Sequence, residues 1–304
     1  MDEDKRHNSE QKKTTQELVE QFGVDYPIED IDSPENPRLG EVAALDAELN
    51  GSHQSLSEEE FREIVENGGV IISHVGPGNK LISEASLMLT SVEGGSSPLQ
   101  RGLPEWLAYC DGSAVSKDYR GKGLQKQLLN AREAVAKEEG KLAIAASVRQ
   151  RNVTSIKSMI KCGYIMIADS PHYYGDEVKD ARVVMLKDFE LGNPFKDLDS
   201  DHEMLEDSLR GIVEPSGIQE KLASGSDVIS IAVQQSDEVD EVYNQAVATL
   251  LRNGYIGVAC NDIDIGDSDS ERSDAMTFVK LESLPLDVAE AIKLRQEEIQ
   301  SIVG

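Results

Sequence analysis

The sequence predicts an α/β fold in which helices and strands alternate along most of the chain. Apolar residues recur at helical spacing in some segments and form continuous runs, typical of buried strands, in others. A glycine-rich turn, Gly121-Lys122-Gly123, joins a strand-like run to a helix-like run. From residue 25 the predicted order is helix, helix, three strands, helix, strand, helix, strand, strand, which favours a sheet flanked by helices.

Caps, breakers and periodicity define the first elements. Helical spacing of apolar residues from Leu39 ends at Asn50-Gly51, a natural helix stop. Ser57-Glu58-Glu59-Glu60 is a capping box that starts the next helix. The stretch 91–98 is rich in glycine, serine and proline, so we expect a loop there. The expected elements are helices over 14–22, 39–49 and 57–67, and strands over 70–74, 81–89 and 106–115.

The elements after the glycine turn follow the same signals. Leu124, Leu128, Ala131 and Val135 share one face of a helix that stops at Gly140. An alanine-rich apolar run follows, as in a buried strand. The expected elements are a strand over 142–148, a helix over 153–161, and strands over 164–168 and 182–187.

The C-terminal part repeats the end of this pattern. Asn253-Gly254-Tyr255-Ile256 resembles Cys162-Gly163-Tyr164-Ile165 and lies between a helix predicted over 239–252 and a further strand. With strands expected over 229–233 and 274–280, this predicts a partial strand–helix–strand–strand repeat, followed by a helix over 285–302. No glycine-rich turn precedes the repeat, so we expect no second cofactor there. Coincidence between two α/β units is the alternative.

Composition limits the classes of partner. The 304 residues include 30 Lys and Arg against 57 Asp and Glu, a net charge of −27, and residues 191–304 hold 24 acidic and 8 basic residues. Such a chain should repel nucleic acid and anionic membranes, and it favours a basic or neutral substrate. The alternative is simply an acidic protein without such a preference.

Membrane, metal and redox classes are not predicted. No run approaches the 18 or so apolar residues of a membrane span. Cys110, Cys162 and Cys260 have no short spacing, so we expect neither a metal site nor a redox pair. Three thiols and no signal-like start favour a cytoplasmic protein. The run 261–269 is acidic, but Arg272 stands where a calcium loop needs its closing glutamate, so we expect a solvated loop or a docking surface.

The glycine turn has the chemistry of an anion site. Two glycines two residues apart let the backbone turn tightly and approach a ligand. Amide groups at the following helix start point outward, where the helix dipole is positive. Arg120, Lys122 and Lys126 add side-chain charge. A pyrophosphate is the expected ligand.

A second motif follows at Asn152, Ser155, Ile156 and Gly163-Tyr164. Together the two resemble the cofactor motifs of the GNAT family of N-acetyltransferases, Arg/Gln-x-x-Gly-x-Gly/Ala and then Asn-x-x-Ala with a later Gly-Phe. The resemblance implies a mixed central sheet flanked by helices, and acetyl-CoA as co-substrate. It implies three regions: residues 1–24, disordered or short helical; 25–190, the acyltransferase domain; and 191–304, an acidic α/β unit with the partial GNAT-like repeat.

The same resemblance assigns cofactor contacts. The backbone around Ser113, Ala114 and Val115 would pair with the pantetheine arm like an added strand. The amides that would hold the pyrophosphate belong to Arg120, Gly121, Lys122, Gly123, Leu124 and Gln125. Gln125 departs from the usual small residue but still offers its amide. Asn152 would cap the following helix, with or without a cofactor contact.

Two catalytic positions common in the family are empty. Met159 stands where many members have a tyrosine, and Ala145-Ala146-Ser147-Val148 carries no carboxylate. Tyr173 and Tyr174 are the candidate general acids for the leaving thiolate. Asp111 and Glu105 are the candidate bases, acting through water. Strand alternation predicts that Asp111, Ser113 and Val115 share one face.

The predicted function is therefore acetyl-CoA-dependent N-acetyl transfer to a primary amine of a small molecule or a protein. The alternative is a non-catalytic acyl-CoA-binding or assembly protein on the same fold. A unit with so few strands has an incomplete core, so residues 200–304 should pack on the first domain or on a second copy in a homodimer. Its charge predicts a lip that attracts a cationic amine.

Overall fold

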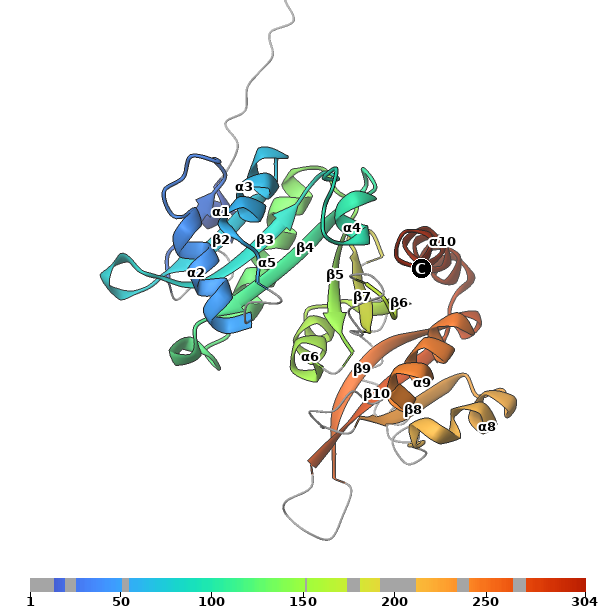
Figure 1. Cartoon of the computed structure of the whole chain (residues 1–304). Coiled ribbons are helices and arrows are strands. Elements are labelled where there is room, and N and C mark those ends of the chain that lie inside the picture. The colour runs from blue at the N-terminus through green and yellow to red at the C-terminus, as the bar shows by residue number, and fades with distance from the viewer. Residues whose placement is uncertain are drawn as a thin grey trace, which may run out of the picture.

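A computed structural model describes residues 14–19, 26–50, 55–150, 152–173, 181–191, 212–233, 241–264 and 272–304 (Figure 1). The expectations for residues 1–13, for Tyr174 and for most of the acidic run after Asp264 lie outside these ranges.

The described strands form a single mixed sheet. They are β1 Ile28–Ile31, β2 Val70–Val75, β3 Leu81–Met88, β4 Leu107–Val115, β5 Ala143–Arg149, β6 Ile165–Ser170, β7 Arg182–Asp188, β8 Val228–Val233, β9 Tyr255–Asp264 and β10 Arg272–Lys280. Their order across the sheet is β1-β2-β3-β4-β5-β7-β6-β9-β10-β8. The β4–β5 pair is parallel, whereas the other neighbouring pairs are antiparallel. The predicted mixed sheet is therefore observed.

Helices cover both faces of this sheet. They are α1 Thr15–Val19, α2 Leu39–Asn50, α3 Glu58–Glu66, α4 Pro98–Arg101, α5 Leu124–Glu138, α6 Val153–Lys161, α8 Ile218–Ala223, α9 Glu241–Arg252 and α10 Leu286–Val303. Apolar residues of α5, α6, α8 and α9 belong to one buried cluster, and those of α2, α3, α4 and α10 belong to the other. In the described part of the chain, every helix is too short or too polar to cross a bilayer.

Two local expectations differ from the structure. Residues 28–31 form the edge strand β1, which pairs with β2 although its own sequence, Ile-Glu-Asp-Ile, is short and half acidic. The stretch 91–98, expected to be a loop, ends in the start of α4. Ser97 and Gln100 form a capping box there, and Pro98 occupies the first turn.

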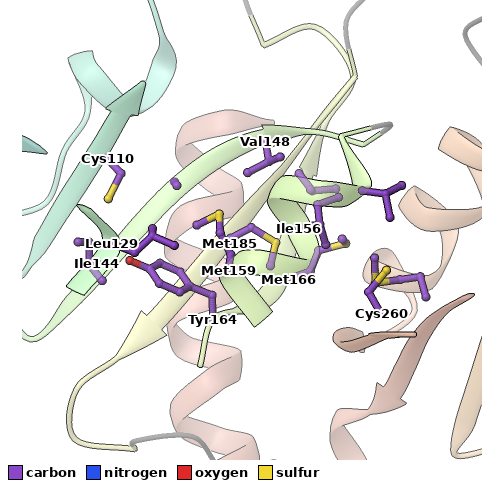
Figure 2. Packing of buried hydrophobic residues seen from close by; sticks show 14 of the residues in the cluster. Cys110, Leu129, Ile144, Val148, Ile156, Met159, Tyr164, Met166, Met185 and Cys260 are labelled. Atoms are coloured by element: carbon purple, nitrogen blue, oxygen red, sulfur yellow. The ribbon is translucent and has the colours of Figure 1, made fainter. Parts of the chain in front are cut away.

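The buried cluster that includes α5, α6, α8 and α9 contains residues from both halves of the chain. Figure 2 shows Leu129, Met159, Tyr164 and Met166 packed in the same layer. Cys260 of β9 belongs to this cluster as well. The two halves therefore share one hydrophobic core rather than forming separate ones.

The C-terminal unit contains the predicted strand–helix–strand–strand repeat, as β8, α9, β9 and β10. Its strand order mirrors the first: β5-β7-β6 is followed by β9-β10-β8. The two copies meet where Met166 pairs with Gly257. Met166 directly follows Gly163-Tyr164-Ile165, and Gly257 directly follows Gly254-Tyr255-Ile256. Equivalent residues of the two copies therefore face each other, as in an isologous contact. Helix α6 contacts β9, and α9 contacts β6.

The repeat extends further than the sequence predicts. Val213 forms a parallel bridge with Ile231 of β8. In the first copy, β4 runs parallel to β5 in the same way. The short helix α8 then precedes β8, as α5 precedes β5. With six residues and no glycine-rich turn before it, α8 lacks the anion site of α5.

Helix α10 ties the C-terminal unit to the first half. The side-chain amides of Gln296 and Gln300 donate to the backbone carbonyls of Ile167 (2.7 Å) and Asp169 (3.1 Å) on β6. Arg295 lies 4.0 Å from the ring centroid of Trp106. The expected packing of this unit on the first domain is therefore observed.

Candidate active site

The sheet opens near its centre, where the two parallel strands β4 and β5 diverge. β4 and β5 pair only from Leu107–Ala143 to Cys110–Ala146. Beyond that point, Gly112 adopts a φ of +89°, and the β3–β4 register shifts between Ala85 and Leu87. A bulge of this kind bends its strand, so β4 turns away from β5.

A cavity of about 440 Å³ lies at this opening. It is lined from both faces of the sheet by Asp46, Leu49, Leu56, Phe61, Glu84, Tyr109, Cys110, Asp111, Gly112, Ser113, Gln125, Leu129, Arg132, Ala146, Ser147, Val148, Arg149, Asn152, Ser155, Met159 and Arg182. No described residue of the C-terminal unit is among them, so the expected acidic lip does not border the cavity.

The glycine turn has the backbone expected of an anion site. Gly121 and Gly123 have φ values of +75° and +79°, and Gly123 is the N-cap of α5. Nothing lies within 4 Å of where a Cβ would stand at either glycine. The first amides of α5 have no partner within the helix, so they can bind a phosphate there.

Ser113 and Gln125 connect this turn to the cavity. The Gln125 side-chain amide donates to the Ser113 hydroxyl at 3.0 Å, and both residues line the cavity. The Val115 carbonyl accepts from the Arg120 guanidinium at 3.2 Å. The larger side chain of Gln125 thus folds back onto β4 and leaves the backbone N–H of Gln125 available to a ligand.

Asn152 caps α6, as predicted, and it also borders the cavity. Its side-chain oxygen accepts from the Ser155 amide at 3.2 Å and caps α6, and it also lines the cavity. Met159, on the same helix, is buried and lines the cavity where a family tyrosine would stand.

Asp111 lies on the other side of the sheet from Ser113. Its carboxylate accepts from the Gln100 side-chain amide at 2.6 Å. The Gln100 oxygen in turn accepts from the Ser97 amide at 2.8 Å, so the α4 cap orients this donor. The prediction that Asp111 and Ser113 share one face is wrong, because β4 has an extra residue in the bulge at Gly112. This extra residue breaks the alternation of side chains between the two faces of the strand.

Burial raises the pKa of Asp111 to about 6, although the Gln100 hydrogen bond and the Arg182 charge lower it. Such a carboxyl group exchanges protons close to neutral pH, as a general base must.

Glu84 of β3 is a second carboxyl group in the cavity. It is 1% exposed, and neither of its oxygens completes a hydrogen bond with another described residue. Burial first, and then the charges of Asp46 and Asp111, raise its pKa well above the ordinary value, whereas Arg132 and the Ala114 amide lower it. The burial of Glu84 therefore favours the neutral form of its carboxyl group.

A chain of hydroxyl groups runs from the turn after β6 to β4 and β5 at the cavity. The Tyr173 phenol is buried and lies 3.0 Å from the Tyr109 phenol, which lies 3.0 Å from the Ser147 hydroxyl. Tyr109 and Ser147 line the cavity, but Tyr173 does not. Burial raises the pKa of Tyr173, and hydrogen bonds lower it in part.

Glu105 is apart from these groups. Its side chain is exposed before β4 begins, and it does not line the cavity. Tyr174 lies outside the described residues. Cys162 does not line the cavity, and burial raises its thiol pKa, which disfavours a reactive thiolate.

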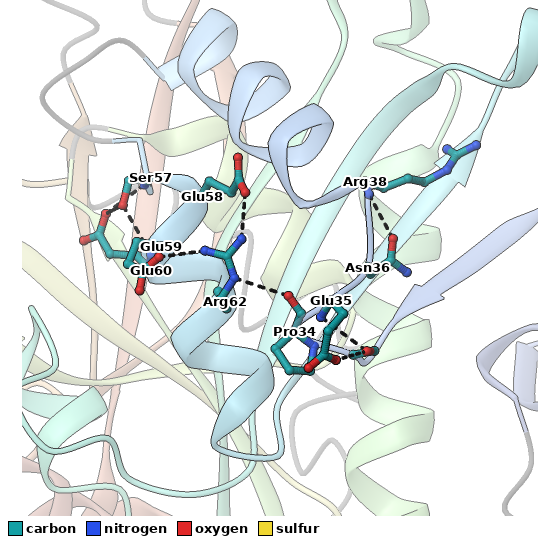
Figure 3. Close-up of polar contacts among 10 residues, drawn as sticks. Pro34, Glu35, Asn36, Arg38, Ser57, Glu58, Glu59, Glu60 and Arg62 are labelled. Carbon is teal, nitrogen blue, oxygen red and sulfur yellow. Dashed lines mark hydrogen bonds and ion pairs between the residues drawn. The ribbon is translucent and has the colours of Figure 1, made fainter.

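Helix α3 contributes Phe61 to the cavity lining, and Figure 3 shows polar contacts that hold this helix in place. Its capping box is complete, with Glu60 accepting from the Ser57 amide at 2.8 Å. Arg62 donates to Glu58 at 2.7 Å and to the Pro34 carbonyl at 3.3 Å, which joins α3 to the segment after β1. These contacts fix the helix that carries buried Phe61 into the lining.

Sequence reasoning missed Asp46, Glu84, Tyr109 and Gln100. The Ser97-Pro98-Leu99-Gln100 capping box was a usable signal for Gln100, since Ser-x-x-Gln marks a helix start. The other three lie in otherwise apolar runs, where no local pattern marks a site. Within the described ranges, no cluster of His, Cys, Asp and Glu has the arrangement of a metal site.

Comparisons with known proteins agree with the motifs. Residues 28–164 match the model of the Acetyltransferase (GNAT) family. No curated protein matches the chain. Similar solved structures include the IAA acetyltransferase from Bacillus cereus ATCC 14579, with 17% identity, 54% of this chain and 99% of that chain covered, and a TM-score of 0.40.

Two further structures are similar at the same level. The ribosomal-protein-S18-alanine N-acetyltransferase from Escherichia coli has 16% identity and a TM-score of 0.42, with 53% of this chain and 92% of that chain covered. The NatC complex bound to Gag peptide and CoA has 16% identity and a TM-score of 0.44, with 55% of this chain and 99% of that chain covered.

Proposed function

Residues 28–164 form a domain of the GNAT acetyltransferase family, and from this premise we propose that the protein transfers an acetyl group from acetyl-CoA to a primary amine. The acceptor is an amine of a small molecule or of a protein. One observation carries the proposal: the cavity where β4 and β5 part is lined by Gln125, which closely follows the glycine turn, and by the buried carboxyl group of Asp111. A thioester between them would meet an amine next to a base.

In this proposal the cofactor lies along the inner edge of β4. The amides from Arg120 to Gln125 bind the pyrophosphate. The backbone of Ser113, Ala114 and Val115 pairs with the pantetheine arm on the side that β5 leaves free. Asn152 contacts the arm while it caps α6.

The proposed reaction needs one base and one acid. The amine nitrogen attacks the thioester carbonyl, its proton passes to Asp111, and the C–S bond breaks to leave a thiolate. Tyr109 gives its proton to that sulfur, supported by Tyr173 and by Ser147. Asp111 then passes its proton through solvent to the Tyr109 phenolate, which restores both groups, and the products are an amide and free CoA thiol. Tyr174 stays a predicted acid, and Glu105 is too exposed to take part directly.

Two measurements test the proposal. Acetyl-CoA should raise the melting temperature by mass action, and thiol release should accompany turnover over a panel of amines. No stabilisation at millimolar acetyl-CoA would remove the cofactor site from the proposal.

A non-catalytic acyl-CoA-binding protein is the second candidate. Met159 favours it, because this buried thioether borders the cavity where many relatives have a tyrosine. Steady thiol release with any amine would overturn this reading, whereas binding of acetyl-CoA with no release over the whole panel would support it.

A further inference from the structure

Glu84 has no part in the proposed reaction, yet it borders the same cavity. It is 1% exposed and belongs to the centre of β3, where each neighbour is buried. Neither carboxyl oxygen completes a hydrogen bond among the described residues. An unpaired buried carboxyl group costs stability. A bound ligand can supply the missing partner.

The groups that face Glu84 already have other partners. Asp46, from α2, accepts the Leu56 amide at 2.7 Å. Arg132, from α5, donates to the Gly112 carbonyl at 2.9 Å and to the Ser86 carbonyl at 3.4 Å. The Nη1 atom of Arg132 therefore supports the bulge of β4, while its Nε is buried and completes no hydrogen bond among the described residues. Neither carboxyl oxygen of Glu84 accepts a hydrogen bond from Arg132, so a cationic ligand can supply the donors that Glu84 lacks.

We propose that the acceptor carries two amino groups, one that reacts as the free amine beside Asp111 and one that Glu84 and Asp46 bind as an ammonium. This inference rests on the proposed function and names its substrate class. An ammonium group has three donors and no acceptor, which suits two carboxyl groups on one wall.

The register of the sheet sets the spacing of the two amines. Glu84 pairs with Ala114, three residues beyond Asp111 on β4. At a rise of about 3.3 Å per residue this places the two carboxyl groups no more than ~10 Å apart along the strand, and the bulge shortens the distance. A short α,ω-diamine spans such a separation, and so does a lysine-like side chain with its own α-amine.

Binding of the second ammonium should release a proton. Without a cation, burial and the charges of Asp46 and Asp111 raise the pKa of Glu84, whereas Arg132 and the Ala114 amide lower it. An ammonium close by favours the ionised carboxylate, so its binding is coupled to loss of a proton. Affinity for a diamine should therefore rise with pH, until the diamine itself loses its charge.

The test is calorimetric titration of the full chain saturated with CoA. The probes are 1,4-diaminobutane and 1-aminobutane, each at pH 7 in two buffers of different ionisation enthalpy. We expect the diamine to bind about tenfold tighter or more, the usual effect of a hydrogen bond to a charged group. We also expect proton release only with the diamine.

Glu84→Gln should remove both the preference and the proton release. The matched control is Glu66→Gln, which changes an exposed glutamate at the end of α3 and should keep both. Glu84→Gln removes an unpaired buried acid and should not lower the melting temperature. If it fails to fold, Asp46→Asn provides the same comparison.

Equal affinity of the wild-type protein for the two amines would overturn the inference, and so would a preference that survives Glu84→Gln. Binding is measured without turnover, so the two proposals fail separately. A diamine preference with no thiol release from acetyl-CoA would keep the subsite and refute the transferase. Turnover with equal kcat/KM for both amines would keep the transferase and refute the subsite.

Discussion

Single residues in this cavity owe their chemistry to burial more than to residue type. Asp111 has a pKa of about 6 where an ordinary aspartate has 3.8, and loss of solvent is the main cause. The same burial is costly for stability, because the folded protein favours the protonated form. Activity and stability should therefore change in opposite directions at this position.

Asp111→Asn should lower kcat/KM by roughly 10²- to 10⁴-fold if Asp111 is the base. It should also stabilise the fold above pH 6. The protonated acid stabilises the folded state fully below about pH 4, and this contribution is lost as the pH rises through about 6. The loss is of the order of 3 kcal/mol, which the neutral amide does not incur.

Calorimetry at pH 5 and pH 8 measures this difference. The gap in melting temperature between variant and wild type should widen at the higher pH, and the wild-type kcat/KM should rise with pH through about 6. The control Asp287→Asn changes an exposed aspartate in the first turn of α10. An Asp111→Asn enzyme with full activity would exclude Asp111 as the base.

Tyr109→Phe should lower kcat by roughly 10²-fold, because it removes the phenol that lines the cavity. Tyr173→Phe should have a smaller effect on kcat and little effect on KM, since Tyr173 acts through Tyr109. Stopped assays of both variants, with acetyl-CoA affinity measured in parallel, separate chemistry from binding. Tyr243→Phe, in α9, is a buried control away from the cavity. Full rates in both test variants would return these phenols to a packing role.

Among the elements, the turn before α5 is proposed to bind phosphate through its backbone alone. Its glycines have positive φ values, and the space beside them is open. A side chain there would be strained and would also project in front of the helix N-terminus, where a phosphate would bind. The effect of backbone strain can be separated from blockage of the phosphate site, because Gly140, just after the C-terminal end of α5, also has a positive φ.

Gly123→Val should abolish stabilisation by acetyl-CoA. The matched control is Gly140→Val, because Gly140 has a φ of +72° and nothing lies within 4 Å of its Cβ position either. Both variants should lose about 1–3 kcal/mol from backbone strain. Thermal shift with and without acetyl-CoA should show the ligand effect lost only at Gly123. Equal ligand effects in the two variants would show that the turn is not the cofactor site.

The whole molecule is built around a pseudo-symmetric junction. Met166 and Gly257 are equivalent residues of the two copies and form the pair that joins β6 to β9. A Cβ at Gly257 would lie 3.0 Å from the Met166 Cβ, closer than most such contacts, so side chains at both positions would be crowded. The partial copy thus covers a sheet edge that would otherwise be open to another chain.

Exchange of these two residues tests the junction. Gly257→Met should destabilise the protein by about 1–3 kcal/mol through overpacking. Met166→Gly should cost about 2–5 kcal/mol through a cavity. The double variant should lose less than the sum, with a coupling of about 0.5–3 kcal/mol, because the side chain fills the same space from the opposite strand. Denaturant titrations of the three variants give this coupling, and strict additivity would contradict the arrangement.

Sequence reasoning reached the features that depend on neighbouring residues in the chain. The turn at Gly121 and Gly123, the Asn152 cap and the Gly-Tyr-Ile echo each rest on local conformational preference, so a single sequence reveals them. Strand β1 was missed because only its pairing with β2 stabilises so short and acidic a segment.

Only the tertiary structure decided which side chains meet in the cavity. Asp46, Glu84 and Tyr109 come from α2, β3 and β4, and none has a local signal that sets it apart from the core. The bulge at Gly112 reverses the face expected for Ser113 relative to Asp111. Both outcomes arise from register and packing between distant segments, and so do the raised pKa values of the buried carboxyl groups. The sequence alone therefore determined where the glycine turn stands, and the fold decided which acids meet in the cavity.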